Sequence, residues 1–233
     1  LGGVDGSTGD LRVGGGGNVA GKVLVFPKGK GSTVGSFVMY DLMVHGVAPA
    51  AVINESAETI VATGAVIASI PMVDSIPSID MFEDGDVVDV DASAGTVEIR
   101  DVEMRESVSS VLLKDGKVLM LKRPEGCHSF PGIWSLVAGS IEPGESPEEA
   151  AGREIMEETA IEVGAPDAAL DPIYVREGRT LWKVYPFAYR VKDAEPVLNE
   201  ENEDFRWVSP DDIQSLETVR DTERVVRLLL GRL

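Results

Sequence analysis

Hydrophobic positions along the chain fall into two successive series of short strands and helices. In the first series, short apolar runs and alternating segments predict strands at residues 22–26, 50–53, 70–73, 86–91 and 95–99. Apolar residues recur at roughly helical spacing over residues 34–45 and 58–68, so helices are expected there. Strands and helices that alternate in this way predict a small α/β domain.

The pattern then begins again in the second half of the chain. Two apolar segments, 108–113 and 117–121, flank Asp115-Gly116, a residue pair that favours the tight turn of a β-hairpin. Further strands are predicted at 133–137 and, in two or three segments, between 161 and 191. Helices are predicted at 147–159 and 222–230, and a short helix is expected after a cap at Ser209.

The restart of the pattern divides the chain into two domains. We expect residues 1–104 and 105–233 to fold separately, with a boundary near residues 102–107. Residues 1–20 are rich in glycine, and we expect them to form a flexible loop rather than part of a core. The predicted fold class is therefore α/β in two domains.

Composition limits the kinds of function. No apolar run approaches the roughly 18 residues that a membrane span requires, so no membrane association is expected. The formal net charge of −19 argues against nucleic-acid binding, because phosphates would be repelled. The N-terminus has no initiator Met and no signal-peptide pattern, which suggests trimming but not secretion. The single cysteine, Cys127, fits a reducing compartment, and a cytoplasmic location is expected.

The strongest chemical signal lies in the first helix of the second series. Glu154, Glu157 and Glu158 stand at i, i+3 and i+4, so they project from one side of that helix. Such crowding of negative charge is costly unless cations neutralise it, and carboxylate oxygens suit Mg²⁺ or Mn²⁺. Arg153 lies beside the cluster and is expected to pair with Glu145 on the preceding loop. The alternative is an ordinary solvated acidic helix face.

This segment resembles the Nudix box, Gly-x5-Glu-x7-Arg-Glu-(apolar)-x-Glu-Glu-x-Gly-(apolar). The matching residues are Gly139, Glu145, Arg153, Glu154, Ile155, Glu157, Glu158 and Ile161. Ala160 stands where the family has the Gly that closes the helix, so we expect a strained or reshaped turn with activity preserved. The resemblance, which covers about residues 108–230, implies an α/β/α sandwich that hydrolyses a diphosphate linkage.

The same resemblance implies which residues act. Glu154, Glu157 and Glu158 would ligate Mg²⁺ or Mn²⁺, with the carbonyl of Gly139 as a further ligand, and Arg153 would belong to the same catalytic set. The metals would polarise the diphosphate for attack by water. The substrate would be a small molecule that contains a diphosphate, of the nucleoside or prenyl class.

Residues outside the box give weaker signals. Glu203, or its neighbours Glu200 and Glu201, are candidates for an extra ligand or a general base. Lys122 and Arg123 end a predicted strand and are candidates for contacts to phosphate, the alternative being ordinary surface charges. Aromatic residues that could stack on a base, but at such positions more often belong to a core, are Phe130, Trp134, Tyr174, Trp182 and Tyr185.

In the first domain, Gly29-Lys30-Gly31-Ser32-Thr33 lies between a predicted strand and a predicted helix. Such a loop would place backbone N–H groups and the Ser32 hydroxyl at a helix N-terminus, where an anionic group binds well. Gly29, Lys30 and Gly31 are therefore candidate substrate-binding residues. The spacing is not that of a P-loop, and the alternative is an ordinary connection with Ser32 as the helix N-cap.

Several segments of the first domain together resemble the small subunit of the aconitase X type, and in particular its archaeal phosphomevalonate dehydratase variety. The segments are residues 2–5, 21–27, 29–36, 48–50 and 57–65. The resemblance implies a swivelling β/β/α domain whose first strand is missing or shortened before Leu1. It also implies that Ser32 is the proton-accepting base of a dehydration, completed by a separate large subunit that carries an iron–sulfur cluster.

Two hypotheses follow for the whole chain. In the first, a dehydratase-type domain is fused to a Nudix hydrolase, with a shared role in isoprenoid precursor metabolism. Because one cysteine cannot hold an iron–sulfur cluster, this chain alone would not catalyse the dehydration. In the second hypothesis, the first domain is a non-catalytic docking or regulatory module for the hydrolase.

Overall fold

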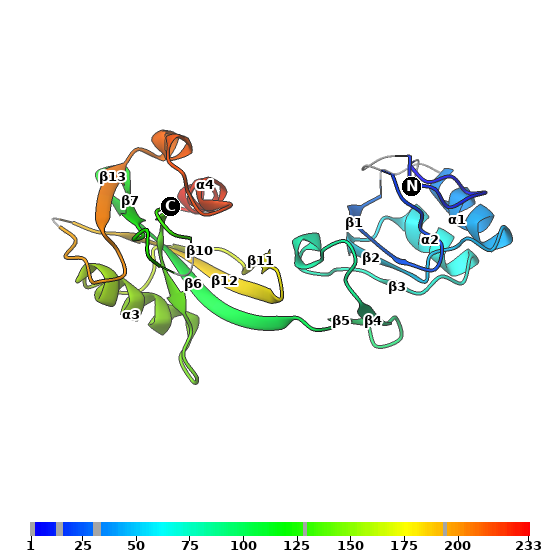
Figure 1. Ribbon diagram of the computed structural model, residues 1–233, viewed down its shortest axis with the longest axis horizontal. Helices are drawn as coiled ribbons and strands as arrows, with labels where there is room; N and C mark the ends of the chain where they lie inside the picture. The colour runs from blue at the N-terminus through cyan, green and yellow to red at the C-terminus, as the bar shows by residue number, and fades with distance from the viewer. Residues whose placement is uncertain (1–2, 13–15, 30–33, 128–129, 193–194) are drawn as a thin grey trace. The chain divides into compact units, whose positions relative to one another are not determined.

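The computed structural model describes residues 3–12, 16–29, 34–127, 130–192 and 195–233 (Figure 1). The chain divides into two compact units. Unit 1 comprises Leu1–Glu103 and Arg176–Leu181, and unit 2 comprises Met104–Val175 and Trp182–Leu233. Both units combine strands with helices, which confirms the predicted α/β fold class. The predicted site residues Lys30, Gly31 and Ser32 lie outside the described residues.

Unit 1 is built on a parallel sheet with the strand order β1-β2-β3. Its main elements are β1 (Val23–Lys28), α1 (Val34–Val44), β2 (Ala51–Ser56), α2 (Thr59–Ile67) and β3 (Met72–Val73). Met39 of α1 and Val61 of α2 are buried in one core cluster with Val52 of β2. Both helices therefore cover the same face of the sheet, and the predicted strands and helices are confirmed.

The glycine-rich segment before β1 contributes to this core. Val4 is 7% exposed and Val19 is 3% exposed, and both pack in one cluster with Leu42 of α1. Antiparallel bridges, including one between Asp10 and Asn18, hold the segment in place. The expectation of a loop outside the core is therefore wrong for Val4 and Val19. Glycines let the chain turn tightly enough to bring isolated apolar residues back to the core.

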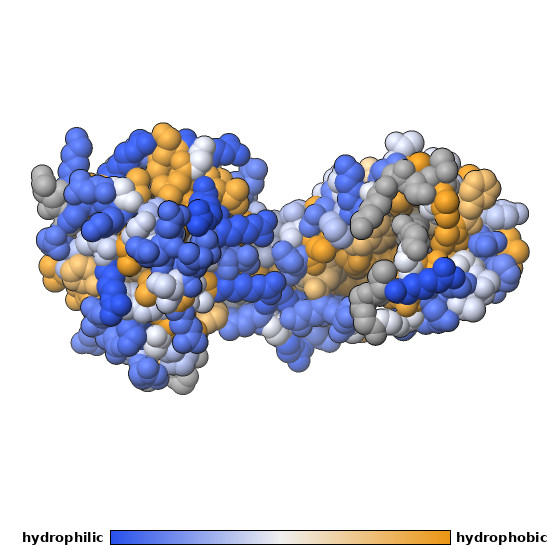
Figure 2. Space-filling model, turned by 90° about the horizontal axis from the view of Figure 1, so that it is seen from above, coloured by the Kyte–Doolittle hydropathy of each residue, from blue (hydrophilic) through white to orange (hydrophobic). Residues whose placement is uncertain are grey.

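The remainder of unit 1 contains a short 3₁₀ helix, η1 (Ile79–Met81), and a separate hairpin of β4 (Val88–Asp91) and β5 (Thr96–Ile99). The hairpin confirms the alternation seen in the sequence. The helical layer also exposes large apolar side chains, since Phe37 is 72% exposed and Val66 is 79% exposed. Figure 2 shows apolar side chains at the molecular surface. Exposed apolar patches of this kind often mark interaction sites.

Unit 2 is organised around a sheet with the strand order β10-β12-β6-β7-β13, to which β8, β9 and β11 add shorter pairings. The strands are β6 (Glu103–Lys114), β7 (Lys117–Lys122), β8 (Trp134–Ser135), β9 (Val137–Ser140), β10 (Ala168–Ala169), β11 (Ile173–Glu177), β12 (Thr180–Arg190) and β13 (Asp204–Val208). The helices are α3 (Pro147–Thr159), η2 (Pro210–Ser215) and α4 (Thr222–Leu230). Helices α3 and α4 span the residues predicted for them.

Helices cover both faces of this sheet (Figure 1). Val108 and Leu112 of β6 pack in one cluster with Ile155 of α3. Val111, which points to the opposite face, packs with Val226 of α4 in a second cluster. Because both faces of the sheet are covered at its centre, four consecutive residues of β7, Val118 to Leu121, are apolar and buried. The predicted α/β/α sandwich is confirmed.

Turn and cap residues account for the ends of several elements. Asp115 and Gly116 have φ values of 51° and 75° between β6 and β7, the left-handed conformation that a type I′ turn needs. The short helix expected after Ser209 is η2, and Ser209 stands at its N-cap position. The Ser209 hydroxyl makes no capping hydrogen bond in the described part of the chain, so the cap lacks the side-chain contact. Within the described ranges, no helix combines the length and apolar character needed to cross a bilayer.

Helix α3 has strong signals at both ends. The Ser146 hydroxyl accepts a hydrogen bond from the Glu149 N–H, and the Glu149 carboxylate accepts one from the Ser146 N–H, which together form a capping box. The helix closes at Ala160, whose φ of 54° and ψ of 22° are left-handed. The turn therefore keeps the conformation that Gly favours, and Ala160 carries the expected strain.

Replacing Ala160 by glycine should stabilise the protein. Because glycine adopts left-handed angles without steric conflict, Ala160→Gly is expected to raise the free energy of unfolding by about 1 kcal/mol. Ala165→Gly, at an exposed position without a positive φ, is the matched control and should lower it. Urea denaturation measures both changes. Equal destabilisation by the two variants would contradict the strain assigned to Ala160.

Candidate active site

The candidate site lies on the side of α3 that packs against the sheet. Ala151 and Ile155 are fully buried in the core. Glu154 and Glu158 follow Ala151 at i+3 and i+7, so the packing that fixes the helix also draws these two carboxylates inward. The Glu154 side chain is 12% exposed, whereas that of Glu157 is 54% exposed.

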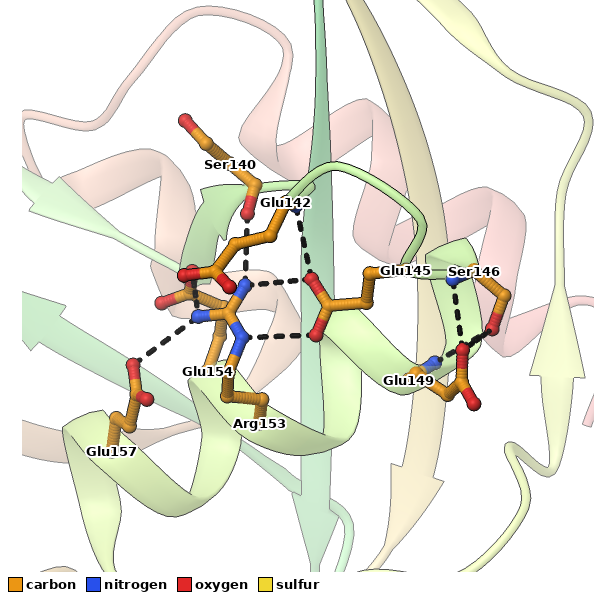
Figure 3. Close-up of polar contacts among 8 residues, drawn as sticks. All are labelled: Ser140, Glu142, Glu145, Ser146, Glu149, Arg153, Glu154 and Glu157. Atoms are coloured by element: carbon orange, nitrogen blue, oxygen red, sulfur yellow. Dashed lines mark hydrogen bonds and ion pairs between the residues drawn. The ribbon is translucent and has the colours of Figure 1, made fainter.

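Arg153 connects the helix to the loop that precedes it (Figure 3). Its guanidinium donates to both carboxylate oxygens of Glu145, at 2.9 and 3.0 Å, which confirms the predicted pair. It also donates to the Ser140 carbonyl at 2.9 Å, to Glu154 Oε1 at 2.8 Å and to Glu157 Oε2 at 3.2 Å. One partly buried cation thus fixes the loop and holds two of the predicted metal ligands.

Gly139 is required because Glu154 lies directly against it. A Cβ at position 139 would lie 1.9 Å from Cδ and Oε1 of Glu154, far inside van der Waals contact. Gly139 belongs to β9, where it pairs with Val108 of β6. The first residue of the predicted motif is therefore glycine for reasons of space. Its backbone lies beside the Glu154 carboxylate, as the sequence interpretation requires.

The Glu158 carboxylate is almost completely removed from water, with an exposed fraction of 4%. Oε1 accepts a hydrogen bond from the backbone N–H of Ala138 at 3.3 Å, and Oε2 accepts one from Nδ2 of Asn202 at 3.0 Å. Burial raises the pKa of Glu158 to about 8, although both hydrogen bonds act in the opposite direction. Burial also raises the pKa of Glu154, against the lowering effect of Arg153. Burial therefore opposes the charged form of both carboxylates, and Arg153 offsets part of this effect only at Glu154.

The loop before β13 carries the candidates for an additional acid. The charge of Glu201 raises the pKa of both buried helix carboxylates. Glu203 instead forms an ion pair with Lys122. Of these two acids, Glu201 is the one whose charge acts on the carboxylates of α3. Asn202, which contacts the cluster directly, was not identified from the sequence, because a single amide in an acidic loop gives no recognisable signal.

Relatives of known name match each half of the chain. The phosphomevalonate dehydratase small subunits of Methanocella arvoryzae and Thermococcus sibiricus are 55% and 52% identical to it over 105 and 108 residues. These matches cover 42% and 43% of this chain and 80% of each relative. The crystal structure of the MutT protein from Methanosarcina mazei Go1 is 25% identical, with a TM-score of 0.51, and the match covers 56% of this chain and 95% of that one.

Family models agree with this division. A model described as an aconitase X swivel domain matches residues 1–99, and one described as a NUDIX domain matches residues 104–229. The chain belongs to the Nudix family and, at its N-terminus, to the aconitase X swivel family. Both resemblances noted in the sequence are confirmed. The chain thus joins a Nudix hydrolase domain to a domain like the phosphomevalonate dehydratase small subunit.

The Nudix carboxylates are not grouped as a ready-made metal site. Among the residues that the structure describes, no three acidic, histidine or cysteine side chains are placed so that they could hold a metal ion. Arg153 accounts for this, because it draws Glu154 and Glu157 to its guanidinium. The alternative of an ordinary solvated helix face does not describe Glu154 and Glu158, since packing against β9 removes both carboxylates from most of the solvent.

The donor set nevertheless fits a divalent cation. It consists of carboxylate oxygens, the ligands that Mg²⁺ and Mn²⁺ prefer. Two of the carboxylates are desolvated, which makes a compensating positive charge favourable. The absence of a side chain at Gly139 lets the Glu154 carboxylate lie against the backbone of β9, near the carbonyl proposed as a further ligand.

The predicted substrate contacts of the Nudix domain have mixed outcomes. Lys122 lies beside the acidic loop, where Glu203 holds it. Trp134 is 6% exposed and packs in the core, and Tyr185 donates a hydrogen bond to Glu106 at 2.7 Å. These two aromatic residues have structural roles, as the alternative interpretation held. The main chain of Arg123 pairs with Ile133 and Gly132 beyond the end of β7.

In the N-terminal domain, Gly29 allows the chain to pass close to α2. A Cβ at position 29 would lie 2.5 Å from Cγ2 of Val61. The loop that follows β1 therefore starts at the N-terminal end of α2, beside the carboxyl ends of the strands. Ligands of open parallel sheets often bind at this edge.

The buried Glu158 should make the stability of the metal-free protein depend on pH. Its pKa in the folded protein is about 8, compared with 4.5 for an ordinary glutamate, so folding favours its protonated form between these values. The stabilising contribution of this proton is fully present below about pH 4.5 and is lost as the pH rises through 8. We expect the free energy of unfolding of the wild-type protein to fall over this pH range. The fall should be larger in wild type than in Glu158→Gln, by on the order of a few kcal/mol.

Urea denaturation in the presence of a chelator, between pH 5 and pH 9, tests this expectation. Glu162→Gln removes an exposed carboxylate just beyond α3 and should keep the wild-type pH dependence. If the Glu158→Gln curve runs parallel to the wild-type curve, Glu158 does not titrate as its burial requires.

Proposed function

We propose that the Nudix domain is a magnesium-dependent hydrolase that cleaves a diphosphate linkage in a nucleoside or prenyl diphosphate. One observation carries the proposal: the end of α3 holds two desolvated carboxylates and one exposed carboxylate within a complete set of acidic Nudix-box residues. The fold holds these negative charges close together, with Glu154 against the backbone of β9. Such a concentration of negative charge favours the binding of divalent cations, which in turn attract anionic substrates.

The residues that would hold the metal are Glu154, Glu157 and Glu158, with the carbonyl of Gly139. When bound, Mg²⁺ or Mn²⁺ would neutralise charge on the diphosphate and lower the pKa of water at the site. Arg153 would keep the loop and helix together through its bidentate bond to Glu145 while releasing Glu157, its longest contact in this carboxylate set. We assign Glu201 as the further acid, acting as an additional ligand or as the general base.

Lys122 and Arg123 are the proposed contacts to the substrate phosphates. Lys122 pairs with Glu203, and their side chains are 29% and 38% exposed. Because water reaches both groups, this ion pair is weak. A phosphate group carries more charge than a carboxylate and would compete well for the Lys122 ammonium. The identity of the group attached to the diphosphate is to be found by a screen.

The first test is a screen for magnesium-dependent hydrolysis of nucleoside triphosphates, dinucleotides of the ADP-ribose type and prenyl diphosphates. Glu157→Gln is expected to lower kcat on the best substrate by about 100-fold or more, because an anionic ligand becomes neutral. Its side chain is exposed, so the melting temperature should change little. Glu148→Gln, on the first turn of the same helix, is the control and should retain the wild-type rate.

Two results would contradict the assignment. In the first, Glu157→Gln hydrolyses the best substrate at the wild-type rate. In the second, hydrolysis proceeds unchanged after chelation of all divalent ions.

We also propose that the N-terminal domain, residues 1–104, completes a dehydratase site with a separate large subunit, while residues 105–233 form the hydrolase. The relatives of this domain are named small subunits, which supports a partner chain. Phe37 and Val66 project large apolar surfaces, and α2 contains no charged residue, as suits a face that contacts another protein. The iron–sulfur cluster would belong to the partner. Ser32 would accept the substrate proton, with Gly29, Lys30 and Gly31 beside it.

A subunit replacement tests this second activity. The chain would be combined with the large subunit of the Methanocella arvoryzae enzyme in place of its own small subunit. We expect dehydration of phosphomevalonate to be restored by the wild-type chain and to fall at least 100-fold in Ser32→Ala, since a methyl group cannot accept a proton. Diphosphate hydrolysis by Ser32→Ala should remain at the wild-type level.

A stable complex that shows no dehydration would favour the alternative, in which this domain is only a docking or regulatory module. A Ser32→Ala variant with full dehydratase activity would remove Ser32 from the mechanism.

A further inference from the structure

Asn202 lies in the loop between β12 and β13, and its side chain is buried against α3. The residue is 7% exposed, and its Nδ2 donates to Oε2 of Glu158 at 3.0 Å. The next residue along the chain is also fixed, because the Glu203 N–H donates to the Lys122 carbonyl at 2.8 Å. The side-chain amide is therefore held in place by the loop and the sheet together.

Glu158 depends on this amide for its orientation. Its other hydrogen bond comes from the Ala138 N–H in β9, at the longer distance of 3.3 Å. The two donors approach different oxygens from different elements, so they fix the plane of the carboxylate. Each carboxylate oxygen has two lone pairs, so both oxygens remain able to accept a further interaction. Without Asn202, the carboxylate would be held only by the longer bond.

An amide suits this position because it donates a hydrogen bond without adding charge. A lysine or arginine here would neutralise Glu158 and compete with a divalent cation. The cluster already has one such competitor in Arg153, which bonds to Glu154 and Glu157 but not, among the described hydrogen bonds, to Glu158. Among the described hydrogen bonds, Glu158 is thus the one of the three proposed metal ligands that receives only neutral donors.

The same contact also positions Glu201. The two residues are adjacent, and the Glu201 N–H donates to Oδ1 of Asn199 at 3.0 Å, which shapes the loop into a tight turn. Anchoring Asn202 to α3 therefore keeps the Glu201 carboxylate near the cluster.

We propose that Asn202 is a positioning residue of the hydrolase: it orients Glu158 as a metal ligand and ties the loop that carries Glu201 to helix α3. The proposal rests on the proposed function, because it takes Glu158 to be a ligand. Groups that hydrogen-bond to metal ligands typically change metal affinity by 10–100-fold when they are removed. Asn202 acts through Glu158 and need not touch the substrate.

The test uses the full chain, freed of metal, and titrates it with Mn²⁺ alone while the free Mn²⁺ is followed by its EPR signal. Asn202→Ala removes the donor and leaves a cavity, whereas Asn202→Leu removes the donor but fills the space. Thr222→Val is the matched control: Thr222 is 6% exposed and donates to the Val219 carbonyl at 2.7 Å, so the variant loses a buried hydrogen bond elsewhere in the same unit.

We expect both Asn202 variants to bind Mn²⁺ about tenfold or more weakly than wild type. The Mg²⁺ concentration that gives half-maximal hydrolysis should rise by a similar factor, with a smaller loss of kcat at saturating Mg²⁺. Thr222→Val should lower the melting temperature without changing either metal midpoint.

Wild-type Mn²⁺ affinity in Asn202→Leu would overturn the proposal and leave the proposed function intact. If Asn202 acted only in packing, Asn202→Leu would bind Mn²⁺ as wild type does, and Asn202→Ala would be less stable than wild type without a change in metal affinity. If the wild-type chain itself binds no Mn²⁺ and hydrolyses no diphosphate, the proposed function fails and the role of Asn202 fails with it.

Discussion

The site depends on the burial of carboxylates by the packing of one helix. Ala151 and Ile155 anchor α3 to the sheet, and the helical repeat then forces Glu154 and Glu158 toward β9. Removing a charged carboxylate from water is costly, and hydrogen bonds from neutral groups offset only part of that cost. The fold therefore maintains a site that a positive charge stabilises. Gly139 makes the close approach possible, because any side chain there would occupy the place of the Glu154 carboxylate.

Arg153 supplies positive charge in this arrangement, and its role is twofold. Through Glu145 and the Ser140 carbonyl it joins the loop to the helix, which is a structural task. Through Glu154 and Glu157 it balances part of the charge of the cluster. A divalent cation would have to displace the contact to Glu157 without disturbing the contacts to Glu145 and Ser140. The exposed Glu157 and the long Arg153–Glu157 bond make that exchange a local rearrangement of side chains.

Sequence patterns predicted the elements of this protein well where a physical rule acts locally. The helix predicted at residues 147–159 is α3, which a capping box at Ser146 starts, and the predicted Asp115-Gly116 turn joins β6 to β7. The box spacing also identified Arg153 and Glu145 as partners. Burial was less accessible to sequence reasoning, because it depends on what a residue meets in three dimensions. No sequence pattern indicates that Glu158 is buried or that Asn202 contacts it. In the glycine-rich start of the chain, the isolated valines Val4 and Val19 form no apolar pattern, although both lie in the core.

The central claim is that the end of α3 binds divalent cations. Anomalous diffraction from crystals of the full chain soaked in Mn²⁺ measures this directly, because it locates the ion independently of activity. The account predicts anomalous density bounded by the carboxylates of Glu154, Glu157 and Glu158 and by the carbonyl of Gly139, with the guanidinium of Arg153 released from Glu157. Manganese bound only elsewhere, with Arg153 still holding both Glu154 and Glu157, would contradict it.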